Sequence, residues 1–161
     1  DTGGFRYQNT NYETLLIGAE ILQKGVNASR IGEFVFNIWT ESGFKALKIA
    51  LNNLEYFGGG AILFSFIPYN EIVEEGLRSY DFEGIVDILR SNRNAKIIIL
   101  LREIEENTFK GSLRSKGEIS INQIAKKFNG GGHPHAAGFE IKYDNVFAIK
   151  EELIREAKRL I

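Results

Sequence analysis

The stretch FNGGGHPHAAGF, residues 128–139, combines a flexible backbone with titratable side chains. It contains both histidines of the chain, His133 and His135. Consecutive glycines can point several backbone N–H groups at one anion and let that anion approach closely, because glycine has no Cβ. His133 precedes a proline, which favours an extended backbone and fixes the direction of the imidazole. The stretch therefore predicts a site for an anion such as phosphate, with His133 beside it.

A purely structural interpretation of the same stretch is also open. Gly130 would then end the preceding helix, and the other glycines would form a loose loop. The nucleotide-binding loops of the dinucleotide and Walker types fit poorly, since these glycines follow a predicted helix and no Gly-Lys-Ser/Thr occurs. His135 is interpreted as an ordinary structural residue. Two histidines without a cysteine or a nearby acidic residue are too few for a metal site.

The segment GSLRS, residues 111–115, supplies a second group of polar side chains. On a strand, Ser112 and Arg114 project from one face while Leu113 points to the other. The planar guanidinium of arginine suits two-point contact with a phosphate. An arginine on a strand is by itself an ordinary surface charge, but Ser112, Arg114 and the glycine run with His133 together predict one shared site.

The elements that would position these residues predict an α/β fold class, a small mixed sheet flanked by helices. Unbroken apolar runs indicate buried strands, and the run containing GSLRS returns beside the second of them as a hairpin partner. Strands are predicted at 61–67, 96–101 extending toward 105, 108–115 and 138–143, and helices at 70–77, 83–89 and 121–128, with a final helix capped by Asp144.

Three helices are predicted before this sheet. The first begins at a capping box that starts with Thr10, and the second begins near Asn27. Four apolar residues of the second helix recur at helical spacing and are predicted to share a buried face. These four are Ile31, Phe34, Val35 and Ile38. The third helix is predicted from Thr40 to Phe57, where three glycines follow and a domain boundary is expected near residue 58.

The composition excludes several classes of protein. The net charge of −1 gives no global attraction to nucleic acid, so any polyanion must be bound at a local basic site. The absence of cysteine excludes disulfides and thiolate catalysis. No apolar run approaches the ~20 residues that span a bilayer, so we expect no membrane partner and a cytoplasmic location. The chain has no methionine and starts at Asp1, so we expect it to be a piece of a longer protein.

The segment GSLRSKGEISINQIAKKFNGGGHPHAAGFEI resembles the C-terminal substrate-binding domain of the DHH phosphoesterase superfamily. That domain carries Gly-Gly-Gly-His followed by Ala-Ala-Gly, after a Ser-x-Arg-Ser strand. The opening DTGGFRYQNT resembles the last metal-ligand motif of the family's N-terminal catalytic domain. DFEGIVDILRS is similar to the connecting segment of the subgroup of bifunctional oligoribonucleases and phosphoadenosine phosphate phosphatases. The resemblance spans almost the whole chain.

The resemblance implies a two-domain enzyme in which two divalent ions, usually Mn²⁺, activate water against a phosphoester. The ions belong to the N-terminal domain, and the C-terminal domain holds the phosphate and nucleotide of the substrate. It implies that Asp1 matches a metal ligand. It also implies substrate-binding roles for Ser112, Arg114, Ser115, Gly130, Gly131, Gly132 and His133.

One departure from the family pattern limits the activity expected of this chain. The Asp-His-His triplet of the family is absent, and one carboxylate cannot hold two metal ions. We therefore expect no catalytic residue here, no retained Mn²⁺ and no activity of the chain alone. Residues 1–40 would be a remnant of the catalytic domain, 41–58 a connector helix and 59–161 the substrate- and nucleic-acid-binding domain.

The predicted function is the substrate-binding part of a metal-dependent phosphoesterase. Its expected partners are short single-stranded oligonucleotides or 3′-phosphorylated nucleotides, and a homodimer is left open. A non-catalytic module that binds nucleic acid, as in alanyl-tRNA synthetases, is the alternative from another class. A cyclic-dinucleotide phosphodiesterase or single-strand exonuclease of the same superfamily is the alternative within it.

Overall fold

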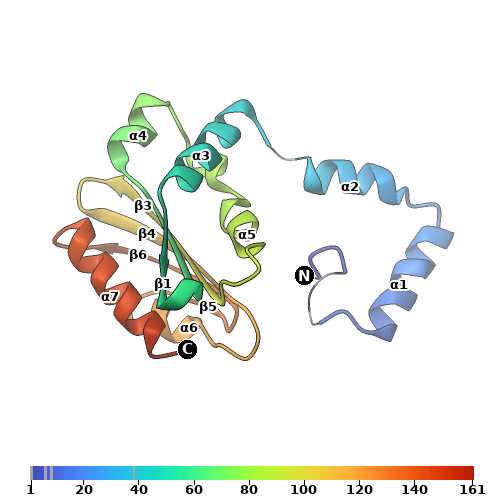
Figure 1. The fold of residues 1–161 in the computed structure, drawn as a ribbon. Coiled ribbons are helices and arrows are strands. Elements are labelled where there is room, and N and C mark those ends of the chain that lie inside the picture. Colours follow the sequence, from blue (N-terminus) through green and yellow to red (C-terminus); the bar gives the residue numbers. More distant parts are fainter. Residues whose placement is uncertain (1, 6, 8, 38) are drawn as a thin grey trace. The chain divides into compact units, whose positions relative to one another are not determined.

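The computed structural model describes residues 2–5, 7, 9–37 and 39–161 (Figure 1). The chain divides into two compact units, Asp1–Ile38 and Trp39–Ile161. Every predicted site residue except Asp1 belongs to the second unit. Asp1, the predicted metal ligand, lies outside the described residues.

The first unit contains two helices, α1 (Tyr12–Gln23) and α2 (Ala28–Phe36). The side chain of Asn11 caps α1 and forms a capping box with Thr14, so the predicted box is present one residue later than expected. Asn27 caps α2 by accepting from the N–H of Arg30 at 3.0 Å, as predicted.

The predicted burial of one face of α2 is wrong for this chain. Ile31, Phe34 and Val35 are 50%, 73% and 54% exposed, and Ile38 lies outside the described residues. The helical spacing itself is correct, because the segment does form a helix. A stripe of apolar residues is buried only when a second layer packs on it, and two short helices provide none.

The second unit is built on a six-stranded sheet with the order β1-β2-β3-β4-β6-β5. β2 and β3 are parallel, and all other neighbours are antiparallel. This mixed sheet, flanked by helices, confirms the predicted fold class. The strands are β1 (Leu54–Phe57), β2 (Ile62–Ile67), β3 (Ile97–Glu105), β4 (Thr108–Ser115), β5 (Gly131–His133) and β6 (Ala136–Lys142).

Helices pack on both faces of the sheet, and each face has its own apolar core (Figure 1). On one face, Ile99, Leu113 and Phe139 pack against α6 (Asn122–Lys127) and α7 (Val146–Lys158). The other core lies over β2 and β3, under α3 (Glu41–Asn52), α4 (Tyr69–Glu74) and α5 (Ile85–Arg90). Alternation along each strand sends successive side chains into the two cores.

The predicted helix over 40–57 is shorter in the structure. α3 ends at Asn52, and the last part of the segment is strand β1, which pairs with β2 from Leu54↔Ser65 to Phe57↔Ile62. Pairing with a buried strand outweighs the helical spacing of the apolar residues, which was the only local signal. Ala46 and Ala50 of α3 are fully buried in the second core, so this helix is an integral part of the second unit. The division into remnant, connector and binding domain stays a prediction.

Two further local predictions differ from the structure. Asn145 caps α7, accepting from the N–H of Ala148 at 3.0 Å, one residue after the predicted Asp144. The glycine run is an extended edge strand, β5, rather than a loop with N–H groups converging on one point. Asn145 directly precedes the first helical residue, Val146, which explains the first difference, and pairing with β6 explains the second.

Asp81 links the start of α3 to the short 3-10 helix Ser79–Phe82. Its carboxylate is 3% exposed and accepts from Ser42 Oγ at 2.6 Å, the N–H of Arg78 at 2.8 Å and Thr40 Oγ1 at 3.2 Å. Burial alone would raise the pKa of Asp81, but these hydrogen bonds outweigh it and lower the pKa.

The change Asp81→Asn is expected to lower the free energy of unfolding by about 1–2 kcal/mol, because an NH₂ group replaces one accepting oxygen. A lowered folded pKa means that this contribution is present above about pH 4 and is lost as the pH falls through the folded value. Urea unfolding of both proteins at several pH values measures the difference. A difference that does not shrink in acid would contradict this role of the carboxylate.

Candidate anion-binding site

The register of three neighbouring strands brings Arg114 and His133 to one face of the sheet. Arg114 of β4 pairs with Ala136 of β6, and Ala136 pairs with His133 of β5. Residues directly opposite each other on paired strands point to the same side. Neighbouring strands are ~4.8 Å apart, so the Cα atoms of Arg114 and His133 are separated by about 10 Å. A phosphate between them is within reach of both side chains.

A second row adds a hydroxyl and a glycine to the same face. Ser112 pairs with Gly138, and Gly138 pairs with Gly131. This row is two residues from the first along the strands, or about 7 Å. We call the surface formed by Ser112, Arg114, Gly131 and His133 the polar face. The two residues of the middle strand in these rows, Ala136 and Gly138, carry no side chain larger than a methyl group.

The structure does not bring Ser115 to the polar face. Its side chain is fully buried, and its hydroxyl donates to the carbonyl of Ile119 at 2.6 Å. Nδ1 of His135 lies 3.2 Å from the same hydroxyl and 3.1 Å from the Ile119 carbonyl. A carbonyl only accepts, so Nδ1 donates to it. These contacts hold the turn between β5 and β6 against the end of β4, and His135 is the structural residue that was expected.

Asp87 on α5 fixes the direction of the Arg114 guanidinium. Nε donates to Oδ1 at 3.0 Å and Nη2 contacts Oδ2 at 3.5 Å, while Nη1 donates to the Leu113 carbonyl at 3.1 Å. A guanidinium has five N–H groups, and these contacts use three of them. One N–H therefore remains on each terminal nitrogen, and such a pair suits two oxygens of one phosphate.

The three predicted glycines differ in what the fold requires of them. A Cβ on Gly130 would lie 2.2 Å from the carbonyl oxygen of Gly138. A Cβ on Gly132 would lie 2.5 Å from the carbonyl oxygen of Ala136, and Gly132 has a φ of +137°. A Cβ on Gly131 would have no atom within 4 Å. Gly130 and Gly132 therefore let β5 approach β6, whereas the open space over Gly131 lies on the polar face.

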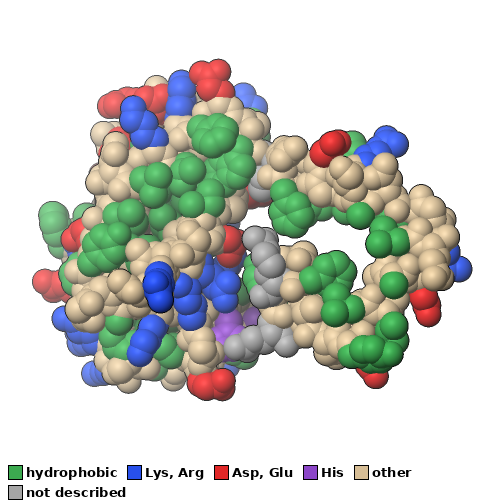
Figure 2. Space-filling view, turned by 45° about the vertical axis from the view of Figure 1, so that its right-hand side comes forward, with side chains coloured by type: hydrophobic (Ala, Val, Ile, Leu, Met, Phe, Trp, Pro, Cys, Tyr) green, Lys and Arg blue, Asp and Glu red, His purple; other side chains and the backbone are tan. Residues whose placement is uncertain are grey.

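The space-filling view shows where the charges gather (Figure 2). Lysine and arginine side chains lie beside histidine on one side of the second unit. β5 is also an edge strand, so its outer backbone groups are free of the sheet ladder. This side of the second unit thus offers cations, an imidazole and backbone N–H groups, all of which can bind an anion.

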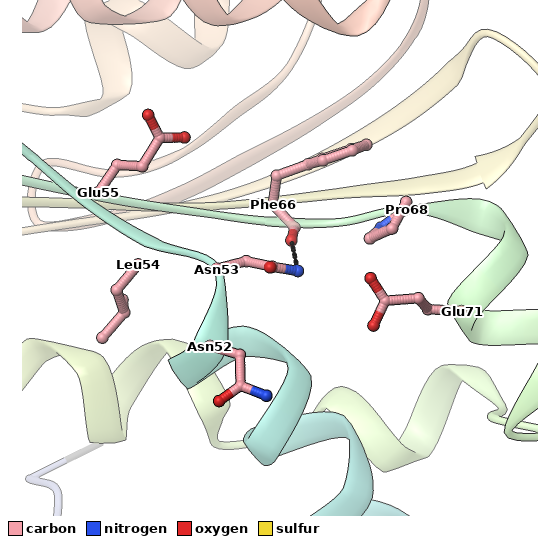
Figure 3. Close-up of a pocket in the computed structure, with 7 residues that line it drawn as sticks. All are labelled: Asn52, Asn53, Leu54, Glu55, Phe66, Pro68 and Glu71. Carbon is pink, nitrogen blue, oxygen red and sulfur yellow. Dashed lines mark hydrogen bonds between the residues drawn. The ribbon is translucent and has the colours of Figure 1, made fainter.

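A separate pocket lies toward the other edge of the sheet (Figure 3). It has a volume of about 370 Å³ and is formed by the end of α3, β1, β2 and the start of α4. Asn53 Nδ2 donates to the Phe66 carbonyl at 3.0 Å, and Glu55 and Glu71 also line the pocket. Its two carboxylates and lack of basic lining residues make it unsuited to phosphate.

The described residues do not fit the manganese ions that the family resemblance implies. None of them forms a group of three or more histidine, aspartate or glutamate side chains able to hold a metal ion.

In the same part of the chain, no helix has both the length and the apolar character needed to cross a membrane.

Sequence reasoning missed Asp87 and Gly138. Asp87 is 27 residues from Arg114 and belongs to an unremarkable short helix, so no local signal connects the two. Gly138 did have a signal in the sequence, because Ala136 and Gly138 of the Ala-Ala-Gly motif are two residues apart and share one face of a strand. Two-residue spacing of small residues on a strand indicates a surface kept clear of side chains.

The amino-acid sequence was also compared with models of known protein families. The family model of the DHHA1 domain matches residues 59–159. This chain belongs to the DHHA1 domain family. The matched DHHA1 region includes the whole polar face, and the family resemblance stated from the sequence is confirmed.

Relatives of this DHHA1 chain include two curated proteins, each described as a bifunctional oligoribonuclease and PAP phosphatase NrnA. The Thermus thermophilus protein is 32% identical, covering 96% of this chain and 48% of the relative. The Bacillus subtilis protein is 29% identical, covering 97% and 50%. The crystal structure of an exopolyphosphatase-related protein from Bacteroides fragilis has 32% identity and a TM-score of 0.87, covering 99% of this chain and 47% of that protein. The chain thus spans about half the length of these relatives.

Proposed function

We propose that this chain is the substrate-binding part of a nucleotide phosphoesterase, and that its polar face binds the terminal phosphate of the substrate. The observation that carries the proposal is the row Arg114–Ala136–His133, which places a guanidinium and an imidazole on one face of three paired strands. The substrates proposed are short single-stranded oligonucleotides and 3′-phosphorylated nucleotides. The names of the curated relatives, an oligoribonuclease and PAP phosphatase, support this class.

Each residue of the polar face has a distinct role in this proposal. The two remaining N–H groups of Arg114 bind two phosphate oxygens, and Asp87 keeps the guanidinium in that direction. The Ser112 hydroxyl donates to a third oxygen or to the adjoining ester oxygen. His133 binds from the opposite side, and Gly131 leaves room for the phosphate between the rows. Cleavage of the ester, with Mn²⁺, is assigned to residues outside the described part of the chain.

Titration calorimetry of the chain with a dinucleotide tests this proposal. The 5′-phosphorylated form should bind at least about 10-fold tighter than the unphosphorylated form, since charge-assisted hydrogen bonds contribute ~1.5–3 kcal/mol. Equal affinities would contradict the proposal. Strong preference for folded tRNA over both dinucleotides would instead favour the non-catalytic nucleic-acid-binding alternative.

A further inference from the structure

Hydrogen bonds bring three cationic residues to one end of β4, and a fourth, Arg93, directly follows Asn92, which contacts one of them. The Arg90 Nε donates to the Ser115 carbonyl at 3.4 Å, and the N–H of Lys116 donates to the Lys96 carbonyl at 2.9 Å. The Lys116 ammonium also donates to the Asn92 carbonyl, which ties the loop after α5 to the end of β4. We call this group the basic corner; it consists of Arg90, Arg93, Lys96 and Lys116.

The basic corner adjoins the polar face. Lys116 follows Arg114 by two residues, so its side chain leaves the same side of the chain about 7 Å further along. The N–H of Ser115, between them, donates to the His135 carbonyl at 3.2 Å, so the turn after β5 also reaches this end of β4. In Figure 2, basic side chains border the histidine on this side of the molecule. Successive phosphates of an extended single strand have a comparable separation.

Three of the four charges of the basic corner, those of Arg93, Lys96 and Lys116, have no carboxylate partner among the described residues. Burial and the nearby charge of Arg90 both lower the pKa of Lys116. Clustered like charges in a protein with a net charge of −1 create a local positive potential that attracts a polyanion.

We propose that Lys116, Arg90 and Arg93 bind the second phosphate of a single-stranded oligonucleotide whose terminal phosphate occupies the polar face. This inference rests on the proposed function and extends it. The terminal phosphate alone sets the affinity for a mononucleotide, and the basic corner adds affinity only when a further backbone phosphate is present. Oligonucleotides are then bound in preference to nucleotides of the same terminal chemistry. Contacts to phosphate carry no base specificity, so this preference depends on length and not on sequence.

The test compares a 5′-phosphorylated mononucleotide with a 5′-phosphorylated trinucleotide as ligands of the whole chain. The change Lys116→Gln should weaken trinucleotide binding about 3- to 10-fold and leave mononucleotide binding within about 2-fold. It should also reduce the slope of log K against log salt for the trinucleotide by about 0.7, the value for one phosphate contact on a single strand. Lys116→Arg should restore both.

Arg93→Gln protects the test against a folding artefact, because Arg93 is exposed and has no hydrogen bond or ion pair among the described residues. It should show the same length-dependent loss. Lys158→Gln removes an equal charge from an exposed site on α7, over the opposite face of the sheet, and should change neither ligand. If Lys116→Gln and Arg93→Gln weakened the binding of both ligands equally, or of neither, the proposed role of the basic corner would be wrong. Trinucleotide binding that depends on Lys116 but not on Arg114 would instead contradict the proposed terminal-phosphate site.

Discussion

Replacing Arg114 with alanine is expected to weaken the binding of a nucleotide terminal phosphate by about 1.5–3 kcal/mol, or roughly 10- to 150-fold in Kd. The change removes the two N–H groups that remain after the contacts with Asp87 and Leu113. No neighbouring side chain on β4 can replace them, since Leu113 and Ser115 point into the opposite core. Titration calorimetry with 3′-phosphoadenosine 5′-phosphate measures the change.

Two comparisons separate loss of binding from loss of structure. Arg114→Lys keeps the positive charge but loses the planar pair of donors, so an intermediate affinity is expected. The folded state should be little affected in both variants, because the ion pair of Arg114 with Asp87 is partly exposed and such pairs contribute ~0–1 kcal/mol. An unchanged Kd for Arg114→Ala would show that this arginine is only a surface charge.

Alanine at Gly130 is expected to lower the free energy of unfolding by about 3 kcal/mol or more, at or beyond the upper range for overpacking. The new Cβ would lie 2.2 Å from the Gly138 carbonyl oxygen and 2.6 Å from the Phe139 Cβ. These atoms belong to β6 and cannot rotate away, so β5 must move off its partner. Urea unfolding, monitored by circular dichroism, measures the loss of unfolding free energy.

Gly131→Ala is the matched control: it should leave stability unchanged and weaken phosphate binding. Its Cβ would meet no atom within 4 Å, so the free energy of unfolding should change by less than about 0.5 kcal/mol. The same methyl group would stand on the polar face, in the row that runs from Ser112 through Gly138 to Gly131, where it should weaken binding of the terminal phosphate. If Gly131→Ala destabilised the protein as much as Gly130→Ala, or left binding intact, the distinction between structural and ligand-facing glycines would be wrong.

The sequence predicted the sheet well because its strands carry strong local signals. The apolar runs of β2 and β3 and the alternation along β4 required no knowledge of distant partners. β1 was missed because its residues also fit a helical spacing, and only pairing with β2 decides between the two. The burial of α2 was overestimated for a related reason, since spacing shows that residues share a face and not that anything covers it.

The candidate site was predicted in part. Alternation along one strand was sufficient to place Ser112 and Arg114 together and to place Leu113 opposite. The same rule also excludes Ser115 from that face, although the family resemblance had included it. The alignment of Arg114 with His133 depends on the register of β4, β6 and β5, which no local pattern encodes. The orientation of Arg114 by Asp87 depends on how α5 packs, and sequence alone gave no sign of it.

The most direct test is a nuclear magnetic resonance titration of the isotope-labelled chain with 3′-phosphoadenosine 5′-phosphate. The resonances of Arg114 Nε–H, the His133 ring and the Gly131 and Gly132 amides should shift together and saturate with one common Kd. The same titration of Arg114→Ala should abolish or strongly weaken these shifts. Saturable shifts confined to another surface, or different Kd values for Arg114 and His133, would contradict a single phosphate site on the polar face.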